Sequence, residues 1–297
     1  MVEGSASYVL RVDPSTLEDL ERSDTAARES VFDRAVAEAT SLREISELTS
    51  EAMRPVREII AADEAASAAS KKLIDVHEAS AAHASARESD NSMVVATSSS
   101  WGGISSYALP PGWTTFTPQY DIPDPPGVPD VRGAPSHGEA DRNTGRVQAW
   151  INLDLDADGL LVVSSRLAIV LRPKKRGTID VHPWIAYAYR AYAHGANLSS
   201  HIVGEIKTTV TDEFGGVITT NPVEMWNFDN DVYTGDRGLL AWRNPNVSFP
   251  GDPSKNYVVW FSASVWGDQS GHYFWGTSAI FGYLDITVQQ VGVGLRP

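Results

Sequence analysis

The hydrophobic and polar positions of this chain follow two different periods. Between residues 45 and 76, apolar side chains recur every seven positions, and a second apolar series follows three positions after the first. That spacing is typical of a helix whose apolar stripe faces a partner helix. From about residue 146 the period becomes two, as in a β-strand with one buried face. The pattern therefore predicts a long helical arm followed by a β-rich head.

The heptad positions define a predicted oligomer seam. Pro55 interrupts its second series, and a proline inside a helix costs about 3 kcal/mol and bends or ends the helix. Two arrangements stay open: a continuous or kinked parallel coiled coil, or an intrachain helical hairpin that uses the same apolar positions. The many alanines would bring helices close together but bury little apolar area. The seam consists of Ile45, Leu48, Ala52, Ile59, Ala62, Ala66, Ala69, Leu73 and Val76.

Composition changes along the chain in step with this periodicity. Residues 15–90 contain no Gly, Trp or Tyr, whereas all nine Trp lie beyond residue 100. Eight prolines fall within 109–135, interleaved with aromatic residues, and we expect this stretch to lie along the head or a partner chain. The predicted parts are a short strand or arm over 1–13, a helical region over 14–90, a Pro/Ser/Gly-rich neck over 91–135, and the head over 136–297.

The head is predicted to be an antiparallel β-sandwich of the jelly-roll kind. Val147, Ala149 and Ile151 alternate with Gln148 and Trp150, and clusters of Gly, Pro, Asn and Asp separate this run from those that follow. A β-prone stretch at 7–12 is expected to add to a sheet edge. The predicted fold class is thus α+β with segregated parts. The expected strands of the head are 146–155, 160–171, 178–194, 198–212, 216–220, 223–229, 256–267 and 277–291.

Charge and composition exclude several classes of function. The net charge of −14 argues against a nucleic-acid partner and against docking on anionic lipid. There are no cysteines, so disulfides and thiolate metal sites are excluded. The first residues lack the features of a signal peptide, and the longest aliphatic run, 167–171, is too short to span a bilayer. We expect a bacterial cytosolic protein or a component of a particle or appendage, with export by another route left open.

Candidate chemistry is sparse. Asp154, Asp156 and Asp158 precede Gly159 as in the start of a calcium loop, but Ser165 stands where the bidentate acid would be needed. A plain Asp/Gly hairpin turn is the competing interpretation. The pair Glu139 and Asp141 is a weak candidate for sugar hydrolysis. Nothing else in the sequence indicates a nucleophile, metal or cofactor, so the sequence predicts no enzyme and no cofactor apart from this calcium candidate.

Aromatic residues are the strongest candidates for ligand contact. If Tyr257 and Phe261 face the core, Trp260 and Trp266 share the opposite face of their strand, and Trp150 also falls opposite an apolar face. Flat rings of this kind stack on sugars. The alternative is that they are buried between protomers or under the Pro-rich segment. A loop flanked by glycines adds a further candidate cluster, Tyr273, Phe274 and Trp275.

The sequence favours a non-enzymatic, oligomeric structural or attachment protein whose head binds a glycan or a protein receptor. The partner expected first is another copy of the chain, with a trimer favoured over a dimer. Stalk, neck and β head together resemble the plan of fibrous appendages of phages and bacterial surfaces, which is an analogy of architecture only. Two alternatives remain: a secreted toxin or effector with membrane-active helices, and a carbohydrate-binding or carbohydrate-active domain.

Overall fold

A computed structural model describes most of the C-terminal two thirds of the chain. Between residues 37 and 72 only isolated positions are described; they have helical backbone and exposed side chains. The described stretches are 9–11, 113–122, 136–153, 159–196, 200–229, 232–240, 245–269 and 277–297.

Apart from those isolated helical positions, the described part of the chain is all β, so the predicted α+β class is wrong. Every element with bounds in it is a β-strand, and no helical arm, coiled coil or trimer is supported there. Leu48 is 62% exposed and Ala62 is also exposed; the other seam residues lie outside the described residues. A heptad pattern reports the amphipathic character of one segment, and an alanine-rich seam buries too little area to specify a packed arm by itself.

Thirteen strands form two sheets in the described residues. Their bounds are β1 (Val9–Arg11), β2 (Thr114–Phe116), β3 (Tyr120–Ile122), β4 (Ser136–Asp141), β5 (Arg146–Leu153), β6 (Gly159–Pro173), β7 (Gly177–Ala196), β8 (Ser200–Asp212), β9 (Val217–Asp229), β10 (Val232–Leu240), β11 (Val247–Gly251), β12 (Tyr257–Gln269) and β13 (Thr277–Arg296).

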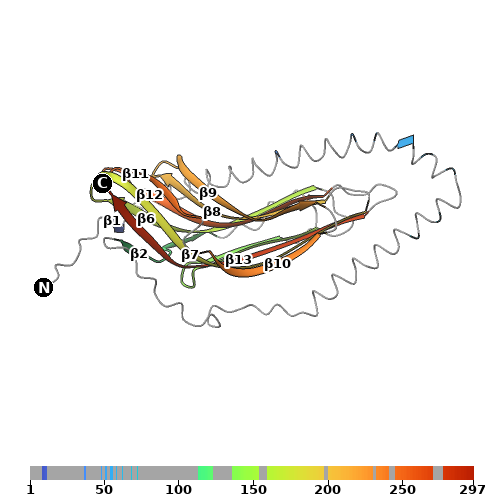
Figure 1. Ribbon diagram of the computed structural model, residues 1–297, viewed down its shortest axis with the longest axis horizontal. Helices are drawn as coiled ribbons and strands as arrows, with labels where there is room; N and C mark the ends of the chain where they lie inside the picture. Colours follow the sequence, from blue (N-terminus) through green and yellow to red (C-terminus); the bar gives the residue numbers. More distant parts are fainter. Residues whose placement is uncertain are drawn as a thin grey trace.

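The two sheets pack face to face, which confirms that the head is an antiparallel β-sandwich. Sheet A has the order β1-β6-β12-β8-β9, with β3 also paired to β6. Sheet B has the order β10-β7-β13-β5-β4, with β11 paired to β7 and β2 to β13. Figure 1 shows β6, β8, β9 and β12 in one layer and β7, β10 and β13 in the other. All the strand pairs are antiparallel, so hairpins and longer returns suffice to connect them.

The core lies between the sheets and follows from strict alternation. On β12, Val259, Phe261 and Ala263 are fully buried within it. On β13, Leu284 and Ile286 face the same core from sheet B. Because successive side chains of a strand point to opposite faces, the residues between them must lie on the outer faces of the sandwich.

The described parts of the two segments that were expected to lie on a sheet edge or along the head or a partner chain, 9–11 and 113–122, pair with strands of the head. In β1, Val9 pairs with Pro173 at the edge of sheet A. From the Pro-rich stretch, β2 pairs with β13 and β3 pairs with β6, and Phe116 is buried in the core. Such short strands would not persist alone, and the existing sheet edges stabilise them.

Candidate functional site

The outer face of sheet B presents a half-buried tryptophan, Trp150, beside a connected set of polar side chains. We call this surface the Trp150 face. It is formed by strands β4, β5, β13 and β7, whose core-facing residues alternate with those of the surface. The face comprises His137, Glu139, Arg146, Gln148, Trp150, Arg190, Tyr283 and Asp285.

Strand register places these residues in two adjacent rows. In the first row, His137 pairs with Trp150, Trp150 with Tyr283, and Tyr283 with Arg190. In the second row, Glu139 pairs with Gln148 and Gln148 with Asp285. Neighbouring strands are about 4.8 Å apart, so four strands span about 14 Å. The face is therefore elongated across the strands.

The Asp285 carboxylate is the centre of a hydrogen-bond network on this face. Arg146 donates from Nε at 3.2 Å and from Nη2 at 2.8 Å. Tyr283 Oη donates to the same carboxylate at 3.0 Å, and Gln148 Nε2 donates to it at 3.2 Å. Gln148 Nε2 also donates to Tyr283 Oη at 2.8 Å. A forked arginine–carboxylate pair supported by two further donors fixes all four side chains in one geometry.

Burial and charge keep these groups in defined protonation states. The side chain of Asp285 is 15% exposed and that of Arg146 is 30% exposed. The hydrogen bonds with Asp285 raise the pKa of Arg146 above its ordinary value. Burial, followed by the Asp285 charge, raises the pKa of the Tyr283 hydroxyl. Tyr283 therefore keeps its proton and serves as a neutral donor over the whole physiological pH range.

Around the fixed network lie groups that remain open to solvent. Trp150 is half-buried, and its ring centroid lies 6.4 Å from that of His137. The side chains of His137 and Glu139 are about half exposed, and their nearest polar atoms are 4.0 Å apart. Arg190 is exposed at the other end of the first row. An indole with donors and acceptors on both sides has the chemistry needed to hold a ring that carries hydroxyl groups.

The other two predicted strand tryptophans lie on the outer face of sheet A and are buried. Trp260 and Trp266 are each 1% exposed, and both lie opposite the core-facing residues of β12, as the alternation predicted. Trp260 Nε1 donates to Thr211 Oγ1 at 3.2 Å, and the Arg166 guanidinium lies 5.9 Å from the Trp260 ring centroid. In this structure neither indole is available as an exposed platform.

Two further groups of candidates cannot be placed. Tyr273, Phe274 and Trp275 lie outside the described residues. Asp154, Asp156 and Asp158 do so as well, so the calcium hypothesis stays a prediction. Among the residues that are described, no group of three or more His, Asp or Glu is arranged to hold a metal ion.

The candidate acid pair lies on β4, but its two members have different surroundings. The Asp141 carboxylate accepts hydrogen bonds from Asn143 N at 2.9 Å and Thr144 Oγ1 at 2.9 Å in the turn to β5. The bond from Asn143, followed by that from Thr144, lowers the pKa of Asp141. Its role in that turn is structural, whereas Glu139 belongs to the Trp150 face.

The sequence predicted that Trp150 lies opposite an apolar face of its strand, but it did not predict the network beside it. Gln148 and Trp150 were correctly placed opposite Val147 and Ala149. The contribution of Asp285 depends on the pairing of β5 with β13. Arg146 and Asp285, which this pairing brings into contact, are 139 positions apart in the sequence. The alternation of polar and apolar residues on β13 indicates which of its side chains face outward. It does not indicate which strand lies beside β13.

Comparison with known proteins gives no family. No family model matches the chain, and no curated protein sequence matches it. One similar solved structure is TmCBM61 in complex with β-1,4-galactotriose, at 12% identity and a TM-score of 0.24, covering 56% of this chain and 90% of that one. Another is infectious bursal disease virus, Gt strain, at 12% identity and a TM-score of 0.25, covering 61% of this chain and 43% of that one. Likenesses this distant do not bear on function.

In the described part of the chain, no helix has the length and apolar character required to cross a bilayer.

Proposed function

We propose that the protein is a non-enzymatic attachment protein whose β head binds an oligosaccharide across the Trp150 face. One observation carries the proposal: a half-buried indole lies on an outer sheet face beside polar side chains that already hold one another in a hydrogen-bond network. Aromatic rings provide large contact area at low entropic cost, and polar groups at their sides provide orientation.

Preorganisation supports binding at this face. Arg146 and Gln148 are held by Asp285, so few side chains need to be ordered when a ligand arrives. Ordering a mobile side chain costs about 0.5–1.5 kcal/mol, and a surface that avoids this cost binds more tightly for the same area. The exposed Glu139 carboxylate and Arg190 guanidinium supply an acceptor and a donor for hydroxyl groups.

The shape of the face supports an extended ligand. The first row crosses four strands from His137 to Arg190, with Trp150 and Tyr283 between them. At about 14 Å this row is longer than one sugar ring. An oligosaccharide lying across the strands would contact the indole in its middle and polar groups at both ends.

A binding role fits the acidic groups better than hydrolysis does. The lowered pKa of Asp141 keeps its carboxylate ionised, and this carboxylate already accepts two hydrogen bonds from its own turn. Glu139 pairs across the strand with Gln148, which is an amide and not a second acid. Hydrolysis of a glycoside requires one protonated and one ionised carboxyl group on either side of the bond.

Glycan-array binding of the full chain, with neutral and acidic oligosaccharides as probes, tests this proposal. Trp150→Ala is expected to weaken binding to the best probe at least tenfold, about the effect of removing a central aromatic contact. Phe214→Ala removes an exposed aromatic ring outside the face and serves as the matched control. Trp150→Phe should retain part of the affinity. Equal binding by the wild type and Trp150→Ala would refute the proposal.

A further inference from the structure

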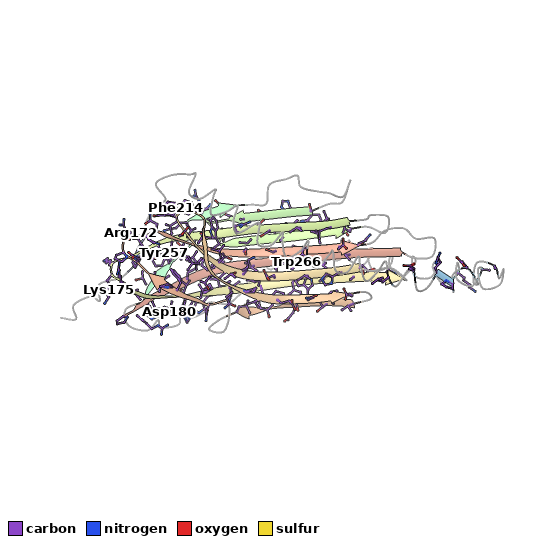
Figure 2. All side chains as sticks on the ribbon, turned by 90° about the horizontal axis from the view of Figure 1, so that it is seen from above. Arg172, Lys175, Asp180, Phe214, Tyr257 and Trp266 are labelled. Carbon is purple, nitrogen blue, oxygen red and sulfur yellow. The ribbon has the colours of Figure 1, made fainter. Side chains whose placement is uncertain are left out.

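Three turns meet at one end of the sandwich. They are the connections β6–β7 (174–176), β8–β9 (213–216) and β11–β12 (252–256), and we call this surface the three-turn end. Figure 2 shows Arg172, Lys175, Phe214 and Tyr257 gathered there, whereas Trp266 lies far along the molecule.

Hydrogen bonds and an ion pair join the three turns into one surface. Arg172 Nε donates to the Pro253 carbonyl oxygen at 2.8 Å, and Asn256 N donates to Glu213 Oε2 at 3.3 Å. Arg176 Nη2 lies 3.4 Å from Asp252 Oδ2. The turns therefore hold one another in place and present their tips together.

The three-turn end is basic although the chain as a whole is acidic. Among the described residues, and with the flanking Arg172 and Asp212 included, its exposed bases outnumber its acids by five to three. Each acid has a hydrogen-bonding role within the turns: Asp212 and Asp252 accept backbone N–H groups of their own turns, and Glu213 accepts from Asn256. The bases are Arg172, Lys174, Lys175, Arg176 and Lys255.

An apolar tip projects from the same end. Phe214 is 67% exposed and is followed by Val217 at 48% and Ile218 at 37%. These are three of the five large hydrophobic residues found exposed in the described part of the chain. Such residues are normally scattered singly, so their concentration on one hairpin indicates a contact surface.

The turn that carries Phe214 is rigid. Asp212 Oδ1 accepts hydrogen bonds from Phe214 N at 3.0 Å and from Gly216 N at 2.8 Å. Gly215 has φ of 85°, a conformation that favours glycine. The backbone of this turn therefore holds Phe214 at the tip of the hairpin.

We infer that the three-turn end docks on an anionic lipid bilayer. Exposed bases attract the negative surface, and the Phe214 hairpin enters the boundary between headgroups and acyl chains. The net charge of −14 argues against such docking only if charge is averaged over the molecule. At distances within about 10 Å, the local bases dominate because salt screens the more distant acids.

Vesicle co-sedimentation of the full chain tests the inference, with phosphatidylcholine vesicles compared with phosphatidylcholine–phosphatidylserine vesicles. The wild type should bind only the mixed vesicles, and binding should weaken as salt is added. Lys175→Ala should weaken binding about fivefold, the factor that about 1 kcal/mol per basic residue implies. Phe214→Ser should weaken it at least about tenfold.

Two control variants separate a specific surface from general stickiness. Val232→Ser removes an exposed apolar side chain where β10 pairs with Ala193 of β7, far along that strand from the three-turn end. Arg142→Glu reverses an exposed charge in the β4–β5 turn. Both should bind the mixed vesicles like the wild type. Absence of binding, equal binding to both vesicle types, or full binding by Phe214→Ser would overturn the inference.

The vesicle result is separable from the proposed glycan function. Trp150→Ala should lose glycan binding and keep vesicle binding, whereas Phe214→Ser should do the reverse. Thermal melts should show that both variants still unfold cooperatively above the assay temperature, with the larger fall in Tm for Trp150→Ala because Trp150 is half-buried whereas Phe214 is 67% exposed.

Discussion

Asp285→Ala removes the centre of the network on the Trp150 face. Arg146 loses its forked partner, and Gln148 and Tyr283 lose a shared acceptor. Because the Asp285 side chain is only 15% exposed, water cannot fully replace it for all three donors. The variant should therefore be less stable than the wild type and should bind glycans more weakly.

The magnitude follows from the exposure of the partners. A hydrogen bond to a charged group is worth about 1.5–3 kcal/mol, but Arg146 is 30% exposed and regains part of its hydration. We expect a loss of about 2 kcal/mol in the free energy of unfolding. For a domain of this size, this corresponds to a fall in Tm of about 4–8 °C.

Urea unfolding of Asp285→Ala, Arg146→Met and the double variant measures the coupling between the two side chains. The coupling energy should be about 1 kcal/mol. Asp236→Ala is the matched control, since Asp236 is an exposed carboxylate of the same sheet that accepts a 3.3 Å hydrogen bond from Tyr187 Oη. The control should change stability by less than about 0.5 kcal/mol. Equal, small effects for Asp285→Ala and Asp236→Ala would show that the network is not fixed as described.

Two further predictions concern stability elsewhere. Burial raises the pKa of Asp180, but the hydrogen bonds from Arg296 and Ser248 together outweigh burial and lower this pKa below its ordinary value of 3.8. The stabilisation that ionised Asp180 gives the folded state is therefore present at neutral pH and is lost as the pH falls through the folded-state pKa. In urea unfolding, Asp180→Asn should have a free energy of unfolding about 1–2 kcal/mol below that of the wild type at neutral pH, and this difference should shrink below pH 3.8. A difference that grows on acidification would contradict this. Gly204→Ala would place its Cβ 2.2 Å from Trp226 Cζ2, so unfolding should show a loss of about 1–3 kcal/mol, and wild-type stability would refute the packing described.

The sheet faces could be predicted from the sequence, but their surroundings could not. Alternation correctly placed Val147 and Ala149 inside and Trp150 outside on β5. The same reasoning placed Trp260 and Trp266 together on the outer face of β12. It could not show that this face is buried as well, because periodicity identifies residues that share a face and carries no information about what covers it.

The sequence did not predict strands β10 and β11, and it led to the wrong α+β class. Both errors have local causes. Strand β10 contains Gly235 and Gly238, and β11 contains Pro250, which weaken a strand signal read along the chain. Pairing with β7 stabilises both. The heptad pattern at 45–76 described one amphipathic segment, and such a pattern does not determine whether that segment packs.

The nitrogen-15 indole signals of the nine tryptophans test the central claim most directly. When the best array oligosaccharide is titrated into the full chain, the Trp150 indole signal should shift in a saturable manner, because this half-buried ring lies at the centre of the proposed site. The signals of Trp260 and Trp266, each 1% exposed, should stay in place. Saturable binding that leaves the Trp150 signal unchanged would contradict the account.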